Sequence, residues 1–122
     1  MKIICTNIGP AEFGGQIEWD GPASNFSRTA DLILKTAYNE DGTTRDREED
    51  GHNFVYQLDD QDRRDLCRNH IFKYYPDWKQ LDIMRRGTKE ANDKMNTFID
   101  TCRDWSNDST NNDPFGLEGV EP

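Results

Sequence analysis

The fold of this chain is decided by residues Tyr75–Trp105, which read YPDWKQLDIMRRGTKEANDKMNTFIDTCRDW. Asp77 and Gln80 have the spacing of a capping box, and Gly87 is suited to end a helix in the left-handed conformation. Apolar side chains then recur every three or four residues, as on one face of a helix about four turns long. They are Ala91, Met95, Phe98, Cys102 and Trp105. This face carries no catalytic motif, so it indicates packing or assembly.

Another helix is expected upstream, beginning at Asp59 or Asp60 and ending before Pro76, because the residue before a proline avoids the helical conformation. Its apolar face would consist of Leu66, Cys67, His70, Ile71 and Tyr74. We expect solvated charges at Asp62, Arg63, Arg64, Asp65 and Arg68. A short helix with Trp78, Leu81 and Met84 lies between the two longer ones. Residues 59–106 are therefore predicted to form a three-helix unit.

The first 58 residues have a different character, with short β-branched or aromatic runs between glycine-rich turns. Residues 1–29 are predicted to be an extended arm or small irregular strands. Residues 30–58 are predicted to be a β-hairpin in which Leu32–Tyr38 pairs with Asn53–Leu58 around an acidic loop, with strand favoured over helix for the first arm. Together with the helical unit, this predicts an α+β fold: an extended or short-stranded N-terminal part with a hairpin, then three helices.

The last segment, residues 107–122, is rich in Asn, Asp and Ser and is predicted to be a mobile acidic tail. An alternative is a short docking motif within it, formed by Phe115, Leu117 and Val120.

Composition restricts the function classes. The chain has 122 residues, only 33% of them apolar, and a net charge of −9 from 24 acidic and 15 basic residues. This charge argues against nucleic-acid binding and against adsorption to anionic membranes. No apolar run approaches the roughly 20 residues that span a bilayer, and the N-terminal run is too short for a signal peptide. A chain with so few apolar residues has a thin core, so we expect protein partners and a homo-oligomer.

Catalytic, metal and cofactor sites are not expected. Asn39, Asp41, Gly42 and Glu48 match part of a calcium loop, but Ala37 occupies the position of its first ligand. Cys67 and His70 are spaced as zinc ligands, yet no further ligands lie nearby in the sequence. No nucleophile motif or phosphate-binding loop is present. We therefore expect a protein that is not an enzyme.

The three cysteines, Cys5, Cys67 and Cys102, are too few and too widely spaced for a disulfide scaffold. We expect them to be buried and reduced. An oxidised pair of Cys67 with Cys102 in an extracellular particle remains the alternative, because both lie on inward helix faces.

Large aromatic side chains are numerous for so hydrophilic a chain. Aromatic rings surrounded by polar residues suit interfaces that are apolar at the centre and wet at the rim. The alternative is that the rings fill a core that is short of Leu and Val. The interface candidates are Trp19, Tyr75, Trp78, Phe98, Trp105 and Phe115.

The run YPDWKQL, which begins at Tyr75, and the later residues Met95, Phe98 and Ile99 resemble a helical segment of bacteriophage tail and tail-fibre-associated proteins. The resemblance extends over Tyr75–Asn107, about a quarter of the chain, and does not reach the first 58 residues. It implies a virion component that contacts other virion proteins, and it supplies no catalytic residue.

The resulting hypothesis is a phage virion structural protein of the tail, neck or fibre-attachment region, assembled in the bacterial host cytoplasm. A capsid decoration or head–tail connector subunit is the alternative within the same class. A small acidic inhibitor that mimics nucleic acid to block a host enzyme is the alternative from another class. Its mark would be carboxylates gathered on one face, which the apolar face within Tyr75–Trp105 argues against.

Overall fold

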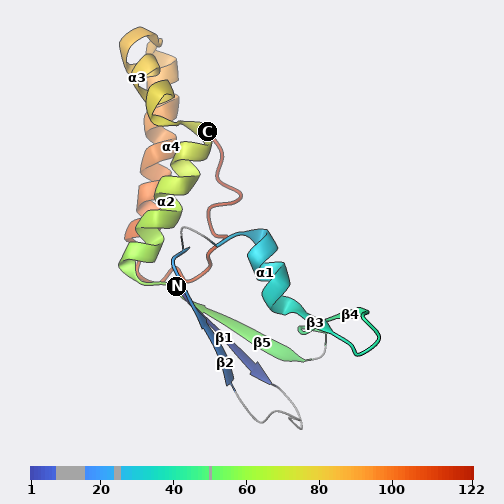
Figure 1. The fold of residues 1–122 in the computed structure, drawn as a ribbon. Helices are drawn as coiled ribbons and strands as arrows, with labels where there is room; N and C mark the ends of the chain where they lie inside the picture. Colours follow the sequence, from blue (N-terminus) through green and yellow to red (C-terminus); the bar gives the residue numbers. More distant parts are fainter. Residues whose placement is uncertain (8–15, 24–25, 50) are drawn as a thin grey trace. The chain divides into compact units, whose positions relative to one another are not determined.

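The computed structural model describes residues 1–7, 16–23, 26–49 and 51–122, and its mixture of strands and helices confirms the α+β class (Figure 1). The chain divides into two compact units, Met1–Gln57 and Leu58–Pro122. Among the described residues, the strands and one helix belong to the first unit, and three helices belong to the second.

The first unit is built on a three-stranded antiparallel sheet. Its strands are β1 (Lys2–Asn7), β2 (Gln16–Asp20) and β5 (His52–Gln57), in the order β2-β1-β5. In this register, Ile3 lies opposite Tyr56 and Cys5 opposite Phe54. Ile3 and Cys5 are both buried, as expected for alternate residues that share one face of a strand. The central strand is therefore β1, which pairs along both edges.

The strand pairing predicted for the hairpin of residues 30–58 is wrong. Arg28–Lys35 forms a helix, α1, and β5 pairs with β1 instead of with Leu32–Tyr38. Ser27 caps α1, because its Oγ accepts a hydrogen bond from the backbone N–H of Ala30 at 3.2 Å. A cap at the start and a basic residue, Lys35, in the last turn favour helix locally, which the contiguous apolar run did not reveal.

A smaller hairpin follows α1. Strand β3 (Thr36–Tyr38) pairs with β4 (Thr44–Asp46) around a turn at residues 39–42, within the acidic loop that the sequence predicts. Gly42 has a φ of 84°, and Asp41 Oδ1 accepts a hydrogen bond from the Thr43 N–H at 3.0 Å. Hydrogen bonds from the hydroxyl and from the backbone N–H of Thr43 lower the pKa of Asp41. The carboxylate thus shapes the turn, a role that needs no metal ion.

The second unit contains α2 (Asp60–Tyr74), α3 (Asp77–Arg86) and α4 (Lys89–Asn107), as the sequence predicts. Asp59 and Asp62 form a capping box at the start of α2. Thr88 caps α4 by accepting the Ala91 N–H at 3.1 Å.

Other details of the helical unit differ from the prediction. The cap of α3 is Pro76, without a side-chain hydrogen bond, so the capping box of Asp77 and Gln80 is absent. Gly87 has a φ of −71° instead of a left-handed conformation. It is required for another reason: a Cβ there would lie 2.5 Å from the backbone oxygen of Ile83.

Two charges predicted to be solvated, Asp62 and Arg63, are buried. Arg63 Nη1 donates to the backbone oxygens of Leu58 at 2.9 Å and Asn111 at 3.3 Å, and its guanidinium also pairs with Asp60. Arg63 therefore ties the start of α2 to the segment that follows α4.

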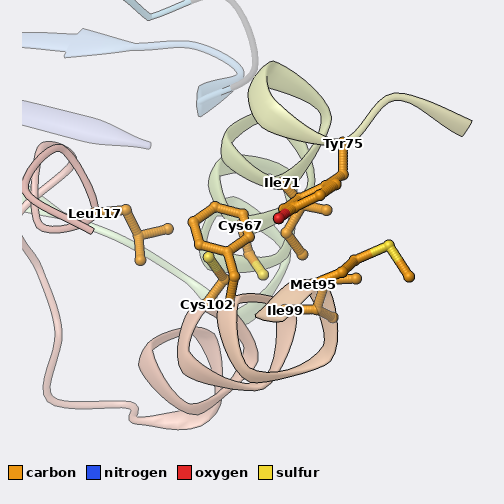
Figure 2. Close-up of a cluster of buried hydrophobic side chains, with 8 residues drawn as sticks. Cys67, Ile71, Tyr75, Met95, Ile99, Cys102 and Leu117 are labelled. Carbon is orange, nitrogen blue, oxygen red and sulfur yellow. The ribbon is translucent and has the colours of Figure 1, made fainter. Parts of the chain in front are cut away.

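The core of the second unit lies between α2 and α4 (Figure 2). Phe98, only 3% exposed, is surrounded by the rings of His70, Tyr74 and Tyr75 at centroid distances of 5.3–5.7 Å. The cluster consists of Cys67, Ile71, Tyr75, Met95, Phe98, Ile99, Cys102 and Leu117. The apolar face predicted on α4 is thus its buried face.

All three cysteines are free and buried. Cys67 and Cys102 belong to the same cluster, one from each helix (Figure 2). Burial raises the pKa of Cys102 to about 11, and the neighbouring Cys67 adds to the increase. Both thiols are accordingly kept neutral at ordinary pH.

The C-terminal segment packs on the helices in place of the mobile tail that composition predicts. Leu117 is part of the core cluster, and His70 Nε2 lies 2.7 Å from the backbone oxygen of Val120. A Cβ at Gly116 would lie 2.5 Å from Nε1 of Trp105, so the segment passes close against this ring. Two of the three residues of the alternative docking motif, Leu117 and Val120, thus pack on the helices of this chain.

Candidate functional site

Helix α3 is held at both ends by side-chain amides. Gln80 Nε2 donates to the Tyr75 backbone oxygen at 2.7 Å, and Asn92 Nδ2 donates to the Ile83 backbone oxygen at 3.1 Å. Ile83 packs against the core cluster, which fixes the face that α3 turns inward. Lys79 Nζ lies 5.3 Å from the centre of the Tyr75 ring, a cation–π distance. These contacts make α3 a well-positioned helix despite its ten residues.

The opposite face of α3 is apolar and uncovered. Trp78 is 70% exposed, Leu81 52% and Met84 66%. Their spacing of three residues places them in one row along the helix. We call these three residues the α3 stripe. Contiguous exposed apolar side chains on a helix mark contact surfaces more often than single exposed residues do.

Charged residues flank the α3 stripe, and they differ in their partners. Arg86 Nε lies 3.5 Å from Asp82 Oδ1 within the helix. Asp77 and Arg85, by contrast, are exposed and have no ion-pair partner among the described residues. The two unpaired charges have opposite sign and lie at opposite ends of the stripe.

The structure separates the six interface candidates into different environments. Trp78 lies on the α3 stripe, whereas Tyr75 and Phe98 are buried in the core cluster. Trp105 and Phe115 are partly buried. Trp19 belongs to β2, but its side chain lies outside the part of the chain that the structure describes. Of the five described rings, only Trp78 is largely open to solvent.

Leu81 and Met84 belong to the candidate surface, although of the three stripe residues only Trp78 was predicted to lie at an interface. The available signal was that α3 carries two apolar directions, with Ile83 on one and the α3 stripe on the other. A short helix beside a single neighbour can bury only one of them. The hydrogen-bonding residue Gln80, three positions before Ile83, marks the buried side.

The first unit contains a polar cluster beneath α1. Asp31, which is buried, accepts a hydrogen bond from the Tyr56 hydroxyl, and Lys35 Nζ pairs with both Asp31, at 3.1 Å, and Glu48. Burial favours a lower pKa for Lys35, but hydrogen bonds with Glu48, Tyr56 and Asp31 outweigh it and raise the pKa. Burial and the bond to Asp31 raise the pKa of Tyr56 to about 12. The hydrogen bond from Tyr56 to Asp31 therefore links β5 to α1, and the ion pairs of Lys35 join Asp31 to Glu48.

Two other features of the structure are weaker candidates for a functional site. Cys5 Sγ lies 3.6 Å from His52 Nδ1, but burial raises the pKa of this thiol, which is the reverse of what a nucleophile needs. A cavity of about 430 Å³ lies between α4 and the C-terminal segment. Its lining includes Asp93, Lys94, Thr97, Phe98 and residues 119–122. The lining mixes charged, hydroxyl-bearing and apolar residues, so it does not single out one class of ligand.

Within the described residues, no helix combines the length and the apolar character that crossing a bilayer requires. In the same parts of the chain, no three His, Cys, Asp or Glu side chains come together in a way that would hold a metal ion. No protein-family model, no curated protein and no solved structure matches this chain.

Proposed function

We propose that this chain is a structural protein of a bacteriophage virion, in the tail, neck or fibre-attachment region, and that it works by protein–protein contact through α3. The observation that carries the proposal is the α3 stripe, with Trp78 70% exposed at one end and Met84 66% exposed at the other. Covering these side chains would remove apolar surface from water, which is the main favourable term in association.

Two further features support a contact role. The stripe lies on a helix fixed by Gln80, Ile83 and Asn92, so little ordering is needed when a partner binds. The segment resembling phage tail and tail-fibre-associated proteins, Tyr75–Asn107, contains the whole of α3. Trp78 and Arg85 also belong to residue types that are enriched at the interface positions that dominate affinity.

A nucleic-acid mimic would need a different surface. Such an inhibitor presents carboxylates in an array, whereas the α3 face presents an apolar row flanked by charges of both signs, Asp77, Asp82 and Arg85. A capsid decoration or connector subunit would use the same kind of contact elsewhere in the particle.

The test is mass spectrometry of purified virions from a phage that encodes the chain, with wild-type and Leu81→Asp versions compared. We expect the wild-type chain in a fixed stoichiometry with the tail or neck proteins, and a strong loss of the Leu81→Asp chain, because a charge on the stripe opposes burial. Phe72→Asp is the matched control: it places the same charge on an exposed apolar position of α2. A chain absent from virions and recovered on a host enzyme would contradict the proposal.

A further inference from the structure

The α3 stripe has an internal symmetry about Leu81. Trp78 and Met84 each lie three residues from Leu81, in opposite directions, and Asp77 and Arg85 each lie four residues from it. Reversing the helix about Leu81 therefore exchanges the two large apolar side chains and also the two opposite charges.

We propose that the α3 stripe binds a second copy of this chain, with the two α3 helices antiparallel and Leu81 on the twofold axis. This inference rests on the part of the proposed function that assigns contact to α3. In this arrangement Leu81 meets Leu81 of the second copy and Trp78 packs beside its Met84. Asp77 faces Arg85 across the axis at both ends, which is the self-complementarity that a twofold interface requires.

Charge distinguishes this arrangement from its rivals. Asp77 and Arg85 have no ion-pair partner among the described residues, while Asp82 and Arg86 already pair within the helix. Two parallel α3 helices would bring Asp77 against Asp77 and Arg85 against Arg85. Like charges in direct opposition are unfavourable, and the helix dipoles would also be aligned. Only the antiparallel arrangement pairs both unpaired charges.

The size of the surface sets the expected strength. A helix of ten residues is about 15 Å long, so a contact between two of them lies at the small end of specific interfaces. We expect a reversible dimer at micromolar to millimolar concentration. Within a particle, neighbouring copies are held at high effective concentration, and the same weak contact becomes saturated.

The first experiment is sedimentation equilibrium of the full chain over that concentration range. The wild type should dimerise, and Leu81→Asp should weaken the dimer by at least about tenfold, because two like charges then meet on the axis. Phe72→Asp should leave the dimer unchanged. Leu81 is 52% exposed, so the variant should keep its helical circular dichroism. A wild-type chain that stays monomeric throughout, or a dimer insensitive to Leu81→Asp, overturns the proposal.

Charge reversal tests the pairing itself. Asp77→Arg and Arg85→Asp should each weaken the dimer, and the double variant should restore it, since each site on both sides then changes sign. Failure of the double variant to recover more affinity than either single variant overturns the antiparallel pairing.

Cysteine cross-linking tests the axis without relying on affinity. The native thiols are buried, so mild oxidation reports on an introduced surface cysteine. Leu81→Cys should form a covalent dimer readily, while Trp78→Cys and Met84→Cys should link to each other in a mixture but poorly to themselves. Equal self-linking at all three positions would indicate parallel helices and overturn the proposal.

A chain found in virions that shows no Leu81→Cys linkage would reject the self-contact alone. Linkage in a chain absent from virions would reject the virion assignment alone.

Discussion

The two units of this chain place opposite kinds of side chain beneath their helices. In Leu58–Pro122, α2 and α4 meet through rings, sulfur atoms and aliphatic groups, with Phe98 at the centre. In Met1–Gln57, α1 turns Asp31 and Lys35 inward while Leu32 and Ile33 are 64% and 65% exposed. The helical unit is stabilised mainly by removing apolar surface from water. The β unit relies in part on a set of paired charges, so the same substitution has different consequences in each.

The largest effect is expected at Phe98. Phe98→Ala should reduce the free energy of unfolding of the helical unit by about 3–5 kcal/mol, because a fully packed ring is lost and a cavity remains. Trp78→Ala, a matched aromatic truncation at an exposed site, should change it by less than about 0.5 kcal/mol. Urea denaturation followed by circular dichroism measures both. A loss below about 1 kcal/mol for Phe98→Ala would show that the cluster is not the core, and the contrast between the units would fail.

The second effect is expected in the β unit. There, truncating a polar residue should reduce stability more than truncating its apolar neighbour, which is the reverse of the usual order. Asp31→Ala should cost about 1–3 kcal/mol, because Tyr56 and Lys35 lose a buried hydrogen-bonding partner. Leu32→Ala, one residue away on the exposed side of α1, should cost less than about 0.5 kcal/mol. Denaturation monitored by a probe in the first unit separates the two. If Leu32→Ala reduces the free energy of unfolding more than Asp31→Ala does, an apolar contact covers that face of α1. The contrast between the two units would then be wrong.

The sequence predicts the helical unit much better than the β unit. The three C-terminal helices were predictable because α4 repeats Met95, Phe98 and Cys102 at helical spacing and buries that same face. Helix α1 was missed because Leu32, Ile33 and Leu34 are contiguous, which carries no periodicity, and because its inward side is polar. The pairing of β5 with β1 joins residues about 50 positions apart, and no local pattern encodes it.

The candidate surface was only half predictable. Trp78 was predicted to be an interface residue, whereas Leu81 and Met84 were predicted only to belong to the same short helix. What decides the matter is Ile83, whose contact with the cluster turns the other three outward. Such a choice between two apolar directions depends on tertiary contacts, not on spacing. Tyr75 and Phe98 show the converse, since aromatic character alone does not distinguish a core ring from a contact ring.

The smallest effect concerns the reactivity of the cysteine thiols. The order in which they react shows which of the two units unfolds first. Burial raises the pKa values of Cys5 and Cys67, and that of Cys102 to about 11, so at pH 8 only about one Cys102 thiol in a thousand is ionised. All three should resist alkylation in the native protein. Cys5 should be modified first as denaturant is added, because among the described residues fewer apolar side chains are buried in its unit than in the helical unit.

Mass spectrometry of the alkylated peptides measures that order. Denatured protein without reductant should yield three free thiols per chain. A single free thiol would instead indicate that Cys67 and Cys102 are oxidised, and simultaneous labelling of all three cysteines would indicate that the two units unfold together.

The central position of β1 also affects how the chain leaves the ribosome. β1 can pair with β2 soon after synthesis, but its other edge has to wait for β5, 45 residues later, counted from Asn7 to His52. At roughly 5–20 residues per second, that edge stays open for roughly 2–9 s. An open strand edge is a template for pairing with other chains. The interval between the two pairings is thus the period in which the nascent chain is most exposed to misassembly, and codon choice between residues 7 and 52 would lengthen or shorten it.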